Sequence, residues 1–450
     1  MQFTVISPGI YTYGAMLIAG ILRKKGYRVS IRRDLKAGIK DTVFLSLYST
    51  LHLINPNIRS FIGSHRKSGG ICYVGGPVSA YPDIVLGELD PDAVVLGEGE
   101  KTAISLARDG ITDQTMGIAF KSGEAIIIRK AQPSDSIEHP LPLIPKDIST
   151  QNIRGANAYI ETHRGCSGAC TFCQVPRFFG HAIRSREIPA IVDEVKAFKK
   201  AGAQRISISG GTGSLYMSHG GKINTVAFVE LLAALAGVMG SHNVSSPDIR
   251  VDCINDEVLN AIRKHTIGWI FFGIESASDS ILRQMGKGVK VQQVEEAIAL
   301  CRQHGLHVAG SFIVGYPTET HEDYELTKDF IAEQALDDVF ISIAEPIPST
   351  PLASLVLRTE RAQNPVFVPH TGEYRTLGFT EAEARCFDLT LHADMYKPGL
   401  HVTTDQVFNT YVEAVKQQGS EIRSVTELLF KYSDIPVKNR DPETPRNRSE

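Results

Sequence analysis

Three cysteines in one short stretch constrain the fold of this chain more than any other feature. Residues 163–180 read HRGCSGACTFCQVPRFFG, and the CxxxCxxC spacing of Cys166, Cys170 and Cys173 lets one loop direct three thiolates at a single centre. Iron-sulfur clusters are held by cysteine thiolates, and full ligation of a 4Fe-4S cluster takes four of them. Because no fourth cysteine lies nearby, the spacing predicts a cluster with one open iron. A zinc knuckle with a distant fourth ligand is the alternative.

This loop resembles the cluster-binding motif of the radical S-adenosylmethionine (SAM) superfamily. Phe172 occupies the aromatic position before the last cysteine, which in that superfamily lies beside the adenine of SAM. The resemblance implies that the three cysteines hold a 4Fe-4S cluster. It also implies that the open iron binds the amino and carboxylate groups of SAM and passes it one electron.

Composition narrows the class of protein. The length of 450 residues allows two or three domains, and the net charge of -3 offers no basic surface for nucleic acid or a membrane. The longest apolar run, 228–240, is shorter than the ~20 residues that cross a bilayer, and the start of the chain reads as a strand instead of a secretory signal. An odd number of cysteines, seven, favours reduced thiols in a soluble, cytoplasmic protein. The four outside the loop are expected to be buried: Cys72, Cys253, Cys301 and Cys386.

The first 110 residues alternate short β-branched runs with helical ones, which predicts a doubly wound, Rossmann-like parallel sheet. One predicted helix, 15–24, has a broad apolar stripe. The predicted strands are 3–6, 28–32, 43–47, 71–74 and 93–96.

The turns after these strands are small and polar. Ligands of such sheets bind outside the carboxyl ends of the strands, although tight turns use Gly and Pro for their own reasons. The residues of these turns are Ser7, Pro8, Gly9, Ser46, Leu47, Tyr48, Ser49, Thr50, Gly75, Gly76, Pro77, Gly97, Glu98, Gly99 and Glu100.

The order and spacing of the turns, above all in VGGPVSAYPDIVLGELDPDAVVLGEGE at 74–100, resemble the cobalamin-binding domain that precedes the radical module in one branch of the superfamily. The resemblance implies that the turns hold the nucleotide tail and the corrin edge of cobalamin. The DxHxxG motif of other cobalamin proteins is absent, and His52 and His65 stand in a different context. The lower face of cobalt would therefore meet the 46–53 loop without a histidine ligand. A Rossmann-like domain that has lost its cofactor is the alternative.

A hairpin and a linker follow. Two β-rich runs flank Ser122 and Gly123, and the Pro- and Asp-rich segment 131–147 lacks periodicity, so we expect a domain boundary near Asp147. The hairpin and the LPLIP stretch resemble the joint between the two modules of the cobalamin-dependent branch. We therefore divide the chain into a cobalamin-binding domain (1–147), a radical SAM domain (148–357) and a C-terminal region (358–450).

The radical SAM domain is expected to be a partial (β/α)6 barrel whose loops after the strands carry the chemistry. One of its helices, 189–199, begins with a proline at a first-turn position. The predicted strands are 159–162, 205–209, 250–253, 269–273, 310–314 and 340–344.

Further resemblance to the superfamily assigns residues to SAM. A glycine-rich turn after the second strand would contact the methionyl amino group, and Glu275 beside Ser276 would accept hydrogen bonds from ribose, unless Glu275 is a surface or capping carboxylate. Lys287, the usual basic residue of this segment, has no assigned role. The residues implied for SAM are Phe172, Ser209, Gly210, Gly211, Thr212, Glu275, Ser276, Ile313, Val314 and Gly315.

The C-terminal region is expected to contain helices at 381–391, 405–416 and 421–432, and to end in a disordered polar tail from 434. These helices would cover the open side of the barrel or receive the substrate.

Together the two resemblances imply a cobalamin-dependent radical SAM C-methyltransferase that acts on an unactivated carbon. The chain is similar to methanogen-type members that methylate the α-carbon of a glutamine in methyl-coenzyme M reductase, a post-translational modification. We expect a protein or peptide substrate, an electron donor such as ferredoxin or flavodoxin, and neither nucleic acid nor a membrane as partner. Candidate cavity residues are Tyr48, Tyr216 and Tyr316.

Three other hypotheses about the function stay open. The first is methylation of a small-molecule natural product, and the second is a non-catalytic iron-sulfur or zinc-binding protein. The third, a methylthiotransferase, would carry a second three-cysteine cluster site upstream, where this chain has only Cys72, and a nucleic-acid-binding domain at its end.

Overall fold

The computed structural model describes residues 2–36, 38, 40–131, 134–209, 211–245, 247–398 and 404–433. The chain divides into two compact units. The first contains Met1–Ser167, Val175–Ser245 and Lys264–Ile267, and the second contains Gly168–Gln174, Ser246–Arg263 and Gly268–Glu450. Both units include parts of the predicted radical SAM domain, so this division does not test the domain boundaries predicted at 147 and 357, which remain predictions.

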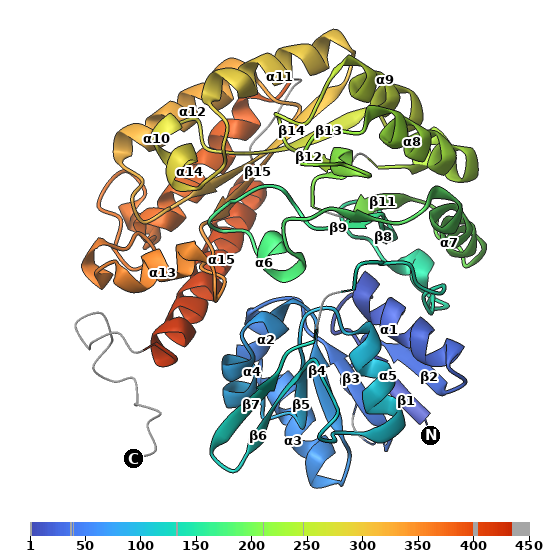
Figure 1. Cartoon of the computed structure of the whole chain (residues 1–450). Coiled ribbons are helices and arrows are strands. Elements are labelled where there is room, and N and C mark those ends of the chain that lie inside the picture. The colour runs from blue at the N-terminus through green and yellow to red at the C-terminus, as the bar shows by residue number, and fades with distance from the viewer. Residues whose placement is uncertain are drawn as a thin grey trace. The chain divides into compact units, whose positions relative to one another are not determined.

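A mixed sheet with the order β2-β1-β3-β4-β5-β6-β7 dominates the start of the first unit (Figure 1). The neighbours from β2 to β5 run parallel, and the hairpin of β6 and β7 adds to the edge in antiparallel fashion. The predicted parallel sheet and hairpin are thus confirmed. The strands are β1 Gln2–Ile6, β2 Arg28–Arg32, β3 Thr42–Ser46, β4 Cys72–Gly75, β5 Ala93–Val95, β6 Ile118–Ser122 and β7 Ala125–Arg129.

Helices pack on this sheet because each has one apolar face. Helix α1 turns Ala15, Ala19 and Leu22 into the same buried cluster as Phe3 and Val5 of β1. Helix α3 begins where it does because Pro56 suits the first helical position and the Asn55 side chain accepts a hydrogen bond from the N–H of Asn57. The helices are α1 Tyr13–Lys24, α2 Leu51–Ile54, α3 Pro56–Lys67, α4 Pro82–Leu89 and α5 Glu100–Asp109.

The rest of the first unit carries the first strands of the predicted barrel. Strands β8 (Ala158–Glu161) and β11 (Ile206–Ser209) pair in parallel, and the short strands β9 (His163–Arg164) and β10 (Arg184–Ser185) pair in antiparallel fashion. Helix α7, predicted to carry an apolar stripe of Ile191, Val192, Val195 and Phe198, buries all of these except Val192, which is half-buried. The other helices are α6 Val175–Phe179, α7 Ile188–Lys200 and α8 Thr225–Met239.

The second unit is built on a parallel sheet with the order β12-β13-β14-β15. Each strand is followed by helical segments, as a partial (β/α) barrel requires, so the predicted α/β fold class is confirmed. The strands are β12 Asp248–Ile249, β13 Trp269–Glu275, β14 His307–Val314 and β15 Asp338–Ile343. The helices are α10 Asp279–Gln284, α11 Val291–Gln303, α12 His321–Gln334, α13 Pro351–Arg358, α14 Glu381–Tyr396 and α15 Asp405–Lys431, and α9 Asp256–His265 precedes β13.

Two predicted elements differ from the structure. The strand predicted at 250–253 is wrong: β12 ends at Ile249, and the N–H of Cys253 donates to the carbonyl of Arg250, which closes a turn. The helices predicted at 405–416 and 421–432 are one helix, α15. Gly419 lies inside it because α14 crosses there, where an added Cβ would stand 2.1 Å from the Glu383 Oε1. The tail from 434 lies outside the described residues.

Candidate active site

A cavity of about 350 Å³ lies in the first unit at the carboxyl ends of the parallel strands. Residues near the first cysteine, His163, Arg164 and Gly165, form part of its wall. Most of the turn residues that the sequence predicted for cobalamin line it: Ser46, Tyr48, Gly75, Gly76, Pro77, Gly97, Glu98, Gly99 and Glu100.

The cavity has an apolar wall formed by side chains of the sheet and of helices α1 and α5, among them Phe44, Tyr73 and Val95. At Gly76 the backbone φ is +91°, and an added Cβ would stand 2.6 Å from the Leu47 carbonyl oxygen, so only glycine allows the two turns to approach. At Gly97 an added Cβ would meet no atom within 4 Å, so the space beside this turn is open. An apolar recess flanked by bare backbone fits a large ligand with an aromatic group.

Other predicted turn residues do not line this cavity. Ser7 is buried and its hydroxyl is 3.0 Å from that of Thr12, and Thr50 is buried and 3.0 Å from the Tyr81 hydroxyl. Leu47 is part of the core, and the Ser49 hydroxyl accepts a hydrogen bond from the N–H of Leu51 as α2 begins. Pro8 and Gly9 line a second, more polar cavity beside α3.

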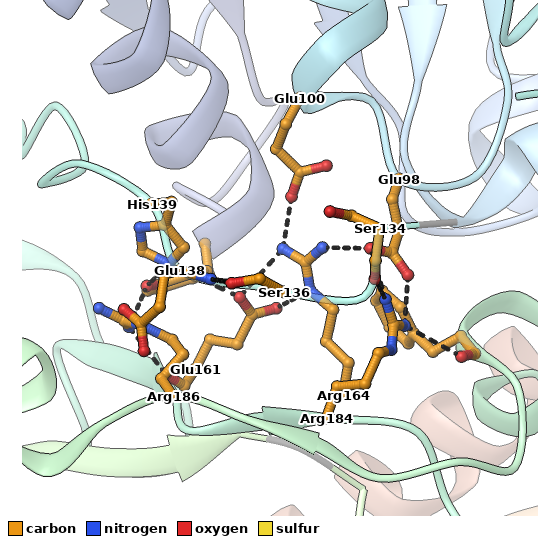
Figure 2. Close-up of polar contacts among 12 residues, drawn as sticks. Glu98, Glu100, Ser134, Ser136, Glu138, His139, Glu161, Arg164, Arg184 and Arg186 are labelled. Carbon is orange, nitrogen blue, oxygen red and sulfur yellow. Dashed lines mark hydrogen bonds and ion pairs between the residues drawn. The ribbon is translucent and has the colours of Figure 1, made fainter. Parts of the chain in front are cut away.

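A buried ionic network holds one side of the cavity (Figure 2). Arg164 donates to Glu98 at 2.7 Å, to Glu100 at 2.5 Å and to Glu161 at 2.8 Å, although its side chain is only 5% exposed. Arg184 also pairs with Glu98. Burial opposes ionisation of Glu161, but contacts with His139 and Arg164 outweigh it and lower its pKa to about 2. The carboxylate of Glu161 is therefore charged at neutral pH.

A second buried ion pair continues inside the same unit. Arg186, which precedes α7, and Glu194 within α7 lie 2.9 Å apart, and both side chains are almost fully buried. The Tyr13 hydroxyl donates a hydrogen bond to Glu194 and accepts one from Arg186. The hydroxyl of Tyr216, a predicted cavity residue, donates to the Arg186 carbonyl at 2.6 Å in the core. Among the candidate tyrosines, Tyr48 lines the cavity, whereas Tyr216 is buried by packing.

The cysteine loop follows β9 and leaves all three thiols half-buried. Gly165 before it has a φ of +99°, and an added Cβ would stand 2.2 Å from the Ala182 carbonyl oxygen, so glycine is required there. In the part of the chain that the structure describes, no three His, Cys, Asp or Glu side chains are grouped to hold a single ion. The ligands of a four-iron cluster stand farther apart than those of one ion, so three half-buried thiols on one loop fit a cluster.

The glycine-rich turn after β11 lies in the first unit. Ser209 ends the strand and Thr212 is buried, while Gly210 lies outside the described residues. Gly211 has a φ of +89° and lines the cavity, and an added Cβ would stand 3.6 Å from the Cβ of Cys166. This turn therefore runs close to the first cysteine.

In the second unit, Phe172 and Ile313 pack against one apolar cluster. Both side chains are half-buried, so each keeps an accessible apolar surface, as a partner of adenine would need. The hydroxyl of Tyr316, whose ring belongs to that cluster, is 3.0 Å from that of Thr171 in the cysteine loop. The N–H of Thr171 also donates to the Met285 carbonyl at 2.8 Å, which anchors the loop.

Glu275 ends β13 in an uncommon conformation for a non-glycine residue, with φ +74° at a register shift in the strand. Its carboxylate is buried and lies 2.8 Å from the Lys287 ammonium and 3.4 Å from the Ser311 hydroxyl. Ser278 caps the next helix, α10, so Glu275 is neither its cap nor a surface carboxylate. Backbone strain of this kind is typical of functional sites.

Three more residues predicted to bind SAM serve the local structure. The Ser276 hydroxyl is buried and accepts a hydrogen bond from the N–H of Ser278. Val314 is part of the core, and the N–H of Gly315 donates to the Glu319 carboxylate at 2.8 Å.

The comparisons with known proteins agree with this geometry. The family model described as the Radical SAM superfamily matches residues 160–331. A protein of Methanocaldococcus jannaschii that carries the provisional name of a methylthiotransferase is 52% identical over 444 residues, which cover 97% of this chain and 98% of that protein. The chain belongs to the radical SAM superfamily. The cysteine loop of this radical SAM protein lies within the matched residues, and its assignment to the 4Fe-4S cluster and SAM stays a prediction.

Solved structures share the fold of this radical SAM protein over nearly its whole length. TsrM of Kitasatospora setae, a radical SAM methyltransferase solved with cobalamin and a [4Fe-4S] cluster, matches with a TM-score of 0.68 and 14% identity, covering 95% of this chain and 99% of that chain. OxsB, a cobalamin-dependent SAM radical enzyme solved with aqua-cobalamin, matches with a TM-score of 0.67 and 17% identity, covering 97% and 74%. At these identities the likeness establishes the shared fold.

Several residues of this radical SAM protein escaped sequence reasoning. Arg164 stands two residues before the first cysteine, but its partners, more than sixty residues away at the 97–100 turn, become visible only in the fold. Arg250, whose Nη1 lies 3.9 Å from the Sγ of Cys170, was predicted as part of a strand.

None of the described helices is both long and apolar enough to span a membrane.

Proposed function

We propose that this radical SAM protein is a cobalamin-dependent C-methyltransferase that methylates an unactivated carbon of a protein substrate. The observation that carries the proposal is the cavity, which joins the glycine turns of the parallel sheet to residues 163–165 and Gly211 beside Cys166. A fold shared with TsrM and OxsB, both solved with cobalamin, supports it.

The residues around the cavity fit cobalamin. Phe44, Tyr73 and Val95 offer an apolar wall for the aromatic base of the nucleotide tail, and the turns at 75–77 and 97–100 offer bare backbone for the corrin amides. The cavity volume of about 350 Å³ suits the tail base, and the larger corrin needs the open space beside Gly97. Arg164 neutralises Glu98 and Glu100 and so keeps this wall of the site in one conformation.

The bound cofactors would supply the bond chemistry, and the chain would supply position and exclusion of water. When bound, the cluster would supply the electron that cleaves one SAM for hydrogen abstraction. Cobalamin would supply the methyl group, with a second SAM as the methyl source and a second electron for the cobalt. Phe172 and Ile313 would hold the adenine, and Glu275 would accept hydrogen bonds from the ribose. The electrons come from a donor of the ferredoxin or flavodoxin class.

For the substrate we propose the α-carbon of a glutamine in methyl-coenzyme M reductase. The support is the similarity to methanogen-type members and the whole-length relative from Methanocaldococcus jannaschii, a methanogen. A small-molecule substrate is the alternative, because TsrM was solved with tryptophan as its substrate. We propose that the reaction takes place in the cytoplasm.

The name of that relative favours a second candidate function, methylthiotransfer. That reaction uses a second three-cysteine cluster upstream of the first. The only upstream cysteine, Cys72, lies fully buried in β4, and burial raises the pKa of its thiol. The cysteine inventory thus favours methyl transfer.

Mass spectrometry of the products separates these candidates. Anaerobically reconstituted protein is incubated with dithionite, SAM, methylcobalamin and a peptide that spans the target glutamine. We expect 5'-deoxyadenosine, S-adenosylhomocysteine and a peptide heavier by one methylene, all absent from a Cys166→Ala control. A peptide heavier by a methylthio group, or no deoxyadenosine above the control, would contradict the proposal.

A further inference from the structure

Arg250 is held on two sides beside a cysteine of the cluster loop. Its Nε and Nη2 each donate to the Asp252 carboxylate at 2.8 Å, and Nη2 also donates to the Lys287 carbonyl at 2.7 Å. The remaining nitrogen, Nη1, lies 3.9 Å from the Sγ of Cys170. With a side chain that is 12% exposed, the guanidinium is fixed and directed at the sulfur.

The charge of Arg250 persists in this environment. A guanidinium stays protonated at every pH at which the protein is folded. A permanent cation therefore stands against one of the three cysteines that hold the cluster. Arginine suits this place because its planar fork can bond the carboxylate and still present a third nitrogen.

A cation beside this sulfur is expected to change the reduction potential of the cluster. A cluster held by three thiolates is an anion, and reduction by one electron adds a further negative charge. Hydrogen bonds to the sulfurs and local charge set the reduction potential of such clusters, and they act strongly where water is partly excluded. The reduced form gains more from the guanidinium than the oxidised form does.

Arg250 is not needed to dock the loop. Thr171 fixes it through its own N–H to the Met285 carbonyl at 2.8 Å and through its carbonyl, which accepts from the N–H of Leu352 at 3.1 Å. Loss of one contact to sulfur leaves those bonds in place. The guanidinium can therefore be changed while the loop keeps its course.

We infer that Arg250 raises the reduction potential of the cluster through Cys170 and thereby eases transfer of one electron from the donor to the cluster. Asp252 limits the effect by partly neutralising the guanidinium. The inference concerns electron delivery only, so it stands or falls independently of which carbon is methylated.

Redox titration of the reconstituted full-length protein, followed by electron paramagnetic resonance without SAM, tests the inference. Arg250→Gln should lower the ratio of reduced to oxidised cluster at least tenfold at a fixed potential, which for one electron is 59 mV. Arg250→Lys should recover part of the shift because it keeps the charge. Arg283→Gln, at an exposed arginine of α10, is the matched control and should leave the potential unchanged.

If Arg250→Gln fails to load iron, a second variant that should shift the reduction potential in the opposite direction still tests the inference. Asp252→Asn removes the compensating carboxylate and retains an oxygen to hold Arg250, so the reduced fraction should rise. An unchanged potential in both loaded variants, or a fall in Asp252→Asn, would overturn the inference. A purely structural role would lower iron content without moving the potential of the clusters that remain.

Discussion

At the scale of single residues, charges buried beside the cofactor sites are each matched by a partner. Glu275 has Lys287, and Arg164 has three carboxylates. Removing one partner of a buried pair leaves an uncompensated charge, whereas removing both does not. Comparing a single with a double substitution therefore distinguishes the role of Lys287 in stability from the proposed role of Glu275 in binding SAM.

Lys287→Met should lower the free energy of unfolding by about 3–5 kcal/mol, because it leaves the buried Glu275 carboxylate unpaired. The double variant Lys287→Met with Glu275→Leu should recover much of that stability and still bind SAM weakly, since leucine offers the ribose no hydrogen-bond acceptor. Urea denaturation and calorimetric titration with SAM measure the two effects. Full SAM affinity in the double variant would argue against a ribose contact at Glu275.

The Glu161 carboxylate should make a contribution to the free energy of unfolding that is lost in acid. Its folded pKa of about 2 is below the ordinary value of 4.5, so its contribution is present above pH 4.5 and is lost as pH falls towards 2. The shift corresponds to about 3 kcal/mol. Urea denaturation of the cofactor-free protein measures this effect. Between pH 6 and 3, the free energy of unfolding should fall more steeply for wild type than for Glu161→Gln. Equal slopes would contradict this account of the network.

Residue identity alone indicated the cysteine loop and the glycine turns, because their conformation and chemistry depend on local spacing. The partners of Arg164 and Arg250 were not predictable, since each ion pair joins segments that only tertiary packing brings together. Lys287 shows the same limit: the sequence marked it as a basic residue, and the fold supplies its partner, Glu275.

At the scale of elements, local periodicity predicted most strands and helices, and it failed where a neighbour decides the outcome. Two helices were predicted at 405–416 and 421–432, but the chain forms one helix, in which the crossing of α14 requires a residue without a Cβ at Gly419. The strand predicted at 250–253 is wrong because the backbone turns there, with the N–H of Cys253 donating to the carbonyl of Arg250.

Two glycine-to-alanine substitutions test the helix crossing. Gly419→Ala places a Cβ 2.1 Å from the Glu383 carboxylate, so we expect a loss of about 1–3 kcal/mol in unfolding free energy. Gly237→Ala, at an exposed position of α8 where a Cβ meets nothing within 4 Å, should instead stabilise by up to about 1 kcal/mol. Chemical denaturation measures both. Similar effects of the two substitutions would show that α14 and α15 do not approach at Gly419.

At the scale of the whole molecule, the first unit joins a Rossmann-like sheet to the start of a radical SAM barrel around one cavity, and the second carries the apolar surface of Phe172 and Ile313. The order of these modules was predictable because each carries local motifs. The ionic network that joins the 97–100 turn to β9 and β10 was not, because it depends on their packing.

Equilibrium binding of cobalamin to the anaerobically reconstituted full-length protein tests the central claim most directly. The account predicts one tightly bound cobalamin, weaker binding of cobinamide, which lacks the nucleotide tail, and loss of that preference in Ala103→Phe, which narrows the apolar part of the cavity. The circular dichroism spectrum of Ala103→Phe should match that of wild type, as a control for folding. Absence of cobalamin binding by the folded, cluster-loaded wild-type protein would contradict the account.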